Sequence, residues 1–139
     1  MVSRNGKDSV GKAACLFVYG TLKREGSAHS VIEPHVDFIG EGSVIGRLYR
    51  LDGYPGLILG GGARSRVWGE LYRIRRTAPL FALLDAYEEC SQRDPRPHPY
   101  RRILAPVTLR GGGRVTAWLY EYIGSVKGRR VIPSGRWEG

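Results

Sequence analysis

Most of the chain consists of short apolar or alternating segments separated by glycine and proline, a pattern typical of β-strands and turns. The predicted strands are 14–19, 36–51 (one bent strand or two), 57–59, 66–74, 100–109 and 114–122. Gly40, Gly42 and Gly46 indicate bulges or a barrel corner within the second segment. Residues 111–113, all glycine, predict a hairpin turn. Segment 66–74 carries apolar residues on both faces, which favours a sheet that closes into a barrel.

One segment, Thr77 to about Glu89, has the spacing of an amphipathic helix. Its apolar residues recur at i, i+3, i+4 and i+7: Leu80, Leu83, Leu84 and Tyr87. Thr77 is a suitable N-cap, and closely spaced prolines after residue 94 prevent continuation. A short helical turn is predicted over 27–33, stopped by Pro34. We therefore expect an α+β fold: a small mixed domain with a curved or barrel-like sheet and one main helix packed beside it.

With 139 residues, the chain is long enough for one domain with its own core. We expect a flexible N-terminal tail over 1–12 and a single domain over 13–139, whose irregular C-terminal part packs back through Trp137. The sequence contains neither a signal peptide nor an apolar run of about 20 residues, which predicts a cytoplasmic protein without membrane attachment.

The formal net charge of +9 permits binding to nucleic acid or to anionic ligands. Tight basic runs are limited to the pairs 75–76, 101–102 and 129–130, without an aromatic-interleaved RNA motif, so nucleic-acid binding is not expected. Cys15 and Cys90 lie far apart without a histidine at ligand spacing, which argues against a zinc site. Cys15 lies in an apolar strand and is therefore expected in the core. The three histidines, His29, His35 and His98, lack a catalytic context and are expected in solvent or turns.

The first candidate for chemistry is the point where the first strand breaks, at Tyr19-Gly20-Thr21-Leu22. A strand that ends in glycine followed by a hydroxyl residue exposes several backbone N–H groups in a short span. Such a nest can hold a carboxylate or a developing oxyanion. The spacing alone is equally compatible with an ordinary turn after a strand.

The second candidate is a group of acidic residues at the end of the predicted helix: Asp85, Glu88 and Glu89. At about 100° per residue, Glu88 borders the apolar face, whereas Glu89 points away and Asp85 is intermediate. Partial burial and the helix dipole are expected to raise the pKa of Glu88 toward the range of a general base. Helical geometry by itself favours the alternative, a surface carboxylate paired with one of the many arginines.

Both candidates resemble signatures of the gamma-glutamyl cyclotransferase-like (AIG2-like) family. The string Tyr-Gly-Thr-Leu-Lys at 19–23 resembles the first signature loop. Leu-Asp-Ala-Tyr-Glu at 84–88, followed by Tyr-Arg-Arg at 100–102, resembles the second. Further matching segments follow in the family order: 53–55, 117–120 and 133–137. The resemblance thus covers about 16–137, with one departure: Glu89 stands where the family usually has glycine, which bears on substrate preference more than on fold.

The resemblance implies cleavage of a gamma-glutamyl amide by the substrate's own α-amine, releasing 5-oxoproline and a free amine or amino acid. It implies that Glu88 transfers the protons and that the backbone of Tyr19, Gly20, Thr21 and Leu22 cradles the glutamyl group. The tyrosines expected to wall the pocket, with core packing as an equal alternative for each, are Tyr54, Tyr100 and Tyr120. For Arg102 we expect a structural pairing rather than a catalytic role.

The implied partner is a small-molecule gamma-glutamyl substrate, and the implied chemistry needs no metal or organic cofactor. Two alternatives differ in kind: a small-molecule-binding or regulatory protein of the same fold without activity, and a basic nucleic-acid-binding protein. The sequence does not determine which group is attached to the gamma-amide, nor the oligomeric state.

Overall fold

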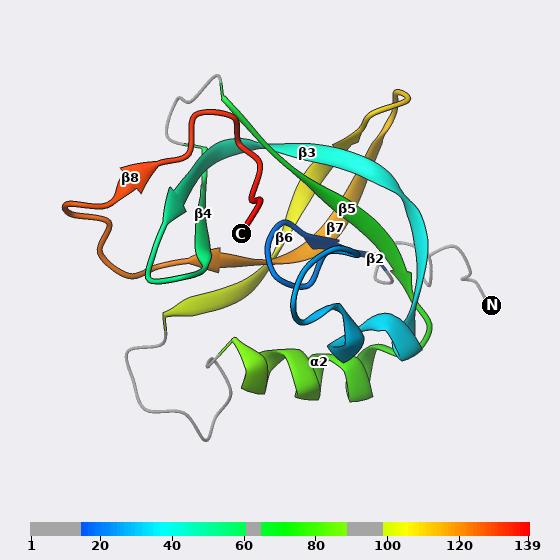
Figure 1. The fold of residues 1–139 in the computed structure, drawn as a ribbon. Coiled ribbons are helices and arrows are strands. Elements are labelled where there is room, and N and C mark those ends of the chain that lie inside the picture. The colour runs from blue at the N-terminus through cyan, green and yellow to red at the C-terminus, as the bar shows by residue number, and fades with distance from the viewer. Residues whose placement is uncertain (1–14, 61–64, 89–98) are drawn as a thin grey trace.

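A computed structural model describes residues 15–60, 65–88 and 99–139, and its centre is a closed five-stranded β-barrel. The barrel strands are β2 (Cys15–Val18), β3 (Val36–Arg50), β5 (Arg66–Ile74), β6 (Tyr100–Leu109) and β7 (Arg114–Tyr122). Their order is β3-β5-β2-β7-β6, and β6 pairs back to β3 (Figure 1). The pairs are antiparallel except for β2 and β7. The predicted barrel-like sheet is therefore confirmed.

The longest strand, β3, serves both the barrel and an outer extension. Its first part pairs with β5, and its second part, from Gly46 to Arg50, pairs with β4 (Pro55–Leu59). The pairing register shifts between Phe38 and Gly40, as the predicted bulge requires. The sequence left open one bent strand or two in this segment, and the structure has one bent strand.

Gly42 permits the barrel to close. It lies opposite Leu109 of β6, and a Cβ atom at this position would lie 2.8 Å from Cγ1 of Val107 and 2.9 Å from the carbonyl oxygen of Thr108. Such distances are below ordinary van der Waals contact, so a larger residue would separate β3 from β6. The glycine predicted at a barrel corner therefore lies at the point of closure.

The main helix, α2 (Thr77–Tyr87), lies along one side of the barrel near the short 3-10 helices η1 (His29–Val31) and η2 (Glu33–His35) (Figure 1). Two predictions about helix boundaries are wrong. The N-cap of α2 is Arg76, without a side-chain capping bond, and Thr77 is its first helical residue. Pro34 does not stop a turn; it lies in the first turn of η2, where its missing N–H is not needed.

The buried face of α2 is narrower than its apolar pattern predicts. Leu80 and Leu84 are fully buried, whereas the residues Leu83 and Tyr87 are 46% and 41% exposed. Only the i, i+4 pair faces the core beneath the helix, because Leu83 lies about 100° around the axis from Leu84.

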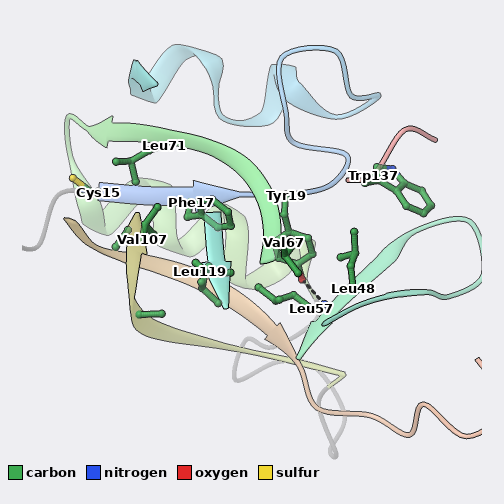
Figure 2. Packing of buried hydrophobic residues seen from close by; sticks show 13 residues of the cluster. Cys15, Phe17, Tyr19, Leu48, Leu57, Val67, Leu71, Val107, Leu119 and Trp137 are labelled. Carbon is green, nitrogen blue, oxygen red and sulfur yellow. Dashed lines mark hydrogen bonds between the residues drawn. The ribbon is translucent and has the colours of Figure 1, made fainter. Parts of the chain in front are cut away.

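Two hydrophobic clusters lie on the two sides of β2. Cys15, Phe17 and Tyr19 belong to the cluster inside the barrel (Figure 2), whereas Leu16 and Val18 belong to the cluster between the barrel and α2. Successive residues of a strand point to opposite faces, so a strand buried on both sides must be apolar throughout. This explains the continuous apolar run of β2 and confirms Cys15 as a core residue.

The C-terminal segment contains more regular secondary structure than predicted. It contains a short strand, β8 (Arg130–Val131), which pairs with Tyr49 and Arg50 of β3. Trp137 is buried, as predicted, and its carbonyl oxygen accepts a hydrogen bond from Nζ of Lys23 at 2.8 Å. The end of the chain is thereby attached to the loop that follows β2.

Some predictions fall outside the described residues: the N-terminal tail, Glu89, Cys90, His98, and the prolines at 95 and 97. Within the three described segments, no helix has the length and hydropathy needed to cross a membrane.

Candidate active site

A cavity of about 370 Å³ lies beside the end of β2. Its lining includes every residue singled out from the sequence as catalytic or substrate-binding: Tyr19, Gly20, Thr21, Leu22, Tyr54, Glu88, Tyr100 and Tyr120. These residues come from the loop after β2, the turn before β4, the end of α2, and strands β6 and β7. The fold thus brings together side chains that are up to about a hundred positions apart in the chain.

The loop after β2 is folded tightly by its own carbonyl groups. The carbonyl oxygen of Gly20 accepts a hydrogen bond from the N–H of Lys23 at 3.1 Å, and that of Thr21 accepts one from the N–H of Ala28 at 2.8 Å. By contrast, the N–H groups of Gly20, Thr21 and Leu22 have no acceptor among the described residues. Three neighbouring donors from cavity-lining residues are therefore available to a bound anion or oxyanion.

Two glycines of this loop, Gly26 and Gly20, have no free space for a Cβ atom. A Cβ atom at Gly26 would overlap the backbone of Thr21, so the return of the chain at this point excludes any side chain. Gly20 is also confined, because a Cβ atom there would lie 2.7 Å from Cγ of Pro55 on the opposite wall. The nest and the wall formed by the Tyr54–Pro55 turn are in direct contact.

Glu88 lies immediately after the last residue of α2 and is half-buried. Its backbone N–H donates to the carbonyl oxygen of Leu84 at 2.8 Å, which fixes its place at the end of the helix. Burial raises the pKa of the Tyr19 phenol well above its ordinary value, and the charge of Glu88 raises it further. Burial also raises the pKa of Tyr100, with smaller contributions from Tyr19 and Glu88. The carboxylate is therefore close enough to act electrostatically on two phenols of the cavity.

The hydroxyl groups of the buried residues Tyr19 and Tyr100 donate hydrogen bonds to backbone carbonyl groups. Tyr19 donates to the carbonyl oxygen of Tyr120 at 2.7 Å and accepts from the N–H of Leu57 at 3.3 Å (Figure 2). Tyr100 donates to the carbonyl oxygen of Pro55 at 2.8 Å. Tyr100, for which core packing was the alternative, therefore packs in the core and lines the cavity at the same time, as Tyr19 does too. Because each phenol has one proton and has already donated it, these oxygens offer a ligand only lone pairs.

The cavity has a wall that the sequence analysis did not assign, formed by Phe17, Val18, Gly53, Pro55 and Tyr87. Tyr87 was expected on the buried face of the helix. Its hydroxyl group instead lies 2.7 Å from Oγ1 of Thr21, which connects the end of α2 to the nest. The motif Leu-Asp-Ala-Tyr-Glu already contained this residue, so its place next to Glu88 was the available signal.

The structural pairing predicted for Arg102 is present. Its Nε donates to Oδ1 of Asp85 at 3.1 Å and its Nη2 to Oδ2 at 3.4 Å. Among the histidines, His29 contacts the carbonyl oxygen of Leu22 through Nδ1 at 2.8 Å. Across the described residues, no group of three or more His, Cys, Asp or Glu side chains is arranged to hold a metal ion.

Comparison with known proteins agrees with this arrangement. The family model "Gamma-glutamyl cyclotransferase, AIG2-like" matches residues 16–139, a range that contains every residue of the cavity. The chain belongs to this family. The gamma-glutamylcyclotransferase family protein YtfP of Escherichia coli is 33% identical over 124 residues, 88% of this chain and 94% of that protein. The gamma-glutamylaminecyclotransferase of Bos taurus is 32% identical over 114 residues, 75% of this chain and 62% of that protein.

Solved structures of gamma-glutamyl cyclotransferase-like proteins share the fold. The solution structure of ytfP from Escherichia coli has a TM-score of 0.62 and 35% identity, covering 88% of this chain and 95% of that chain. The crystal structure of an AIG2-like protein from Mus musculus has a TM-score of 0.65 and 28% identity, covering 78% of this chain and 76% of that chain. The predicted fold class and family are therefore confirmed.

Proposed function

We propose that this protein cleaves a gamma-glutamyl amide by attack of the substrate's α-amine on its own gamma-carbonyl. The products are 5-oxoproline and a free amine or amino acid. The observation that carries the proposal is the presence, in one cavity, of a carboxylate (Glu88) and of three backbone N–H groups without protein acceptors in the described structure. Membership of the "Gamma-glutamyl cyclotransferase, AIG2-like" family and similarity to a gamma-glutamylaminecyclotransferase of Bos taurus support it.

The proposed reaction needs one proton carrier and no enzyme nucleophile. Glu88 accepts a proton from the α-ammonium group, and the resulting amine attacks the gamma-carbonyl carbon. A tetrahedral intermediate forms, and Glu88 passes the first proton to the leaving nitrogen as its bond to carbon breaks. Glu88 then takes a second proton from the attacking nitrogen and passes it to the departing amine, which leaves as an ammonium group. Protons and bonds balance, because both protons lost by the α-nitrogen end on the leaving amine and the new amide bond of 5-oxoproline replaces the gamma-amide bond.

The polarity of the cavity suits such a substrate. The Glu88 carboxylate and the lone pairs of the phenol oxygens form a side rich in acceptors, which favours the α-ammonium group. The N–H groups of Gly20, Thr21 and Leu22 form a side rich in donors, which favours the glutamyl carboxylate or the developing oxyanion. Holding one flexible molecule between these two sides brings its amine and carbonyl together, and such positioning is worth about 7–11 kcal/mol in well-oriented intramolecular reactions.

The test is release of 5-oxoproline from a panel of gamma-glutamyl amides whose leaving groups are an amino acid, a peptide, a polyamine and the side chain of lysine. We expect the wild type to turn over at least one of them. Glu88→Gln keeps the shape of the side chain and removes its basicity, so its turnover should fall by about 10²–10⁴-fold while the thermal unfolding temperature is unchanged. Glu33→Gln, an exposed carboxylate in η2, is the matched control and should retain full activity.

A folded Glu88→Gln protein that retains wild-type turnover would contradict the proposed role of this residue. Silence of the wild type across the whole panel would refute the proposed reaction and leave a ligand-binding protein of the same fold.

A further inference from the structure

Asp85 joins three elements that surround the cavity. Arg102 of β6 and Tyr120 of β7 are directly opposite each other in an antiparallel pair, so their side chains are neighbours on one face. Asp85, in the last turn of α2, contacts both. Its Oδ1 accepts a hydrogen bond from the hydroxyl group of Tyr120 at 2.6 Å and another from Nε of Arg102 at 3.1 Å. One carboxylate thereby links the helix that ends at Glu88 to two strands of the barrel.

The surroundings of Asp85 restrict its movement. The guanidinium group of Arg102 lies 3.9 Å from the ring centroid of Phe81 and 5.1 Å from that of Trp118. The side chains of Arg102 and Asp85 are only 27% and 23% exposed. A partly desolvated, two-point pairing between guanidinium and carboxylate is stronger and better defined in direction than a neutral hydrogen bond.

The direction of each hydrogen bond in this group is determined by its chemistry. A guanidinium group only donates, and an ionised carboxylate only accepts, so the Tyr120 hydroxyl group must donate to Asp85. The phenol has a single proton. In every other hydrogen bond that it forms, the oxygen of Tyr120 is therefore an acceptor.

We propose that Asp85 is a positioning residue: by holding the hydroxyl proton of Tyr120, it makes this cavity-lining phenol an acceptor for the α-ammonium group of a gamma-glutamyl ligand. The identity of the ligand rests on the proposed function, but the polarity of Tyr120 does not. The consequence is selectivity. A ligand that lacks the α-ammonium group loses a donor that both Glu88 and Tyr120 require, and it binds more weakly.

The substitution Asp85→Ala removes the acceptor that Tyr120 and Arg102 share on Oδ1 of Asp85. The hydroxyl proton of Tyr120 is then no longer held by α2 and can turn into the cavity, where it opposes the ammonium group of a ligand. Tyr120→Phe simply removes the oxygen.

The experiment measures equilibrium binding of two ligands by titration calorimetry: a gamma-glutamyl amide and its des-amino counterpart, a monoamide of glutaric acid. The full chain carries Glu88→Gln throughout, so that turnover does not interfere. We expect the preference for the ammonium-bearing ligand to fall about tenfold or more in Tyr120→Phe, the size of one charge-assisted hydrogen bond. Asp85→Ala should also reduce this preference, and the double variant should lose no more than Tyr120→Phe alone.

The control is Asp37→Ala, which breaks a similar two-point pair with Arg75 on the exposed surface and should leave the preference unchanged. Equal loss of affinity for both ligands in Asp85→Ala, or the same loss in the presence and absence of the Tyr120 hydroxyl group, would show a structural role and overturn the proposal. An unchanged preference in Tyr120→Phe would overturn it even if Asp85→Ala does not fold.

Failure of the proposed function gives a different combination of results. If the wild type releases no 5-oxoproline but the Glu88→Gln chain loses its preference in the Tyr120 and Asp85 variants as expected, the reaction is refuted and the role of Asp85 is supported. If the wild type turns over substrate but the preference of the Glu88→Gln chain does not depend on Tyr120, the role of Asp85 alone is refuted. If the wild type releases no 5-oxoproline and the Glu88→Gln chain binds neither ligand, both are refuted.

Discussion

Gly20 offers a sharp test of how closely the two walls of the cavity must approach. It belongs to the nest, and its Cα faces the ring of Pro55 across the cavity wall. A Cβ atom at this position would lie 2.7 Å from Cγ and 3.2 Å from Cδ of that ring. Ordinary van der Waals contact begins at 3.4 Å, so Gly20→Ala must separate the two segments by about 0.7 Å. A proline ring cannot rotate away, because its side chain is closed onto the backbone.

This separation should reduce activity more than stability. Misplacing reacting groups by about 1 Å can reduce the rate about 10²-fold, so we expect kcat/KM for 5-oxoproline release to fall about 10- to 100-fold. Overpacking of this kind costs about 1–3 kcal/mol in unfolding free energy, offset by about 0.4–1 kcal/mol because alanine restricts the unfolded chain. The backbone of Gly20 does not have a positive φ, so alanine adds no backbone strain.

The assay compares Gly20→Ala with Gly40→Ala in 5-oxoproline release and in urea unfolding. Gly40 lies in the β3 bulge, and a Cβ atom there meets nothing within 4 Å, so alanine should be tolerated with wild-type activity. A folded Gly20→Ala protein with wild-type kcat/KM would refute the reasoning that the contact between nest and Pro55 sets the geometry of the site.

Two further predictions concern stability. Leu84→Ala should lower the unfolding free energy by about 2–5 kcal/mol, whereas exposed Leu83→Ala should change it by no more than about 0.5 kcal/mol; equal effects in urea unfolding would contradict the narrow buried face of α2. The pKa of Tyr100 is raised in the folded state, so its phenol stays protonated when the unfolded one ionises near pH 10. The difference in unfolding free energy between wild type and Tyr100→Phe should therefore be constant below about pH 10 and move against the wild type above it; a change beginning near neutral pH would contradict the raised pKa.

The local pattern of the sequence was sufficient for most of the secondary structure. Strands β5, β6 and β7 have the predicted bounds, because alternation and glycine punctuation act over a few residues and need no knowledge of partners. The same holds for the existence of α2. The N-cap of that helix and the role of Pro34 were predicted incorrectly because these depend on the path of the chain on either side of the helix.

The candidate site was accessible from the sequence for a different reason. Helical geometry placed Glu88 at the border of an apolar face, but by itself it favoured a surface carboxylate paired with an arginine. The family motifs favoured a catalytic carboxylate, and Glu88 lines the same cavity as the nest at 20–22. The catalytic role of Glu88 stays a prediction. Asp85 was one of three acids at the helix end, and no local pattern distinguished it.

The sequence by itself determined which segments are strands, which is the helix, and which loop and acid carry the family signature. Only the tertiary structure decided that Gly42 closes the barrel against β6, that Leu83 faces solvent, and that Asp85 holds the proton of Tyr120. The physical reason is the separation along the chain of the residues that determine each feature. Periodicity and turn chemistry are encoded within a few neighbouring residues, whereas the direction of a hydrogen bond between α2 and β7 depends on which distant side chains the packed core brings into contact.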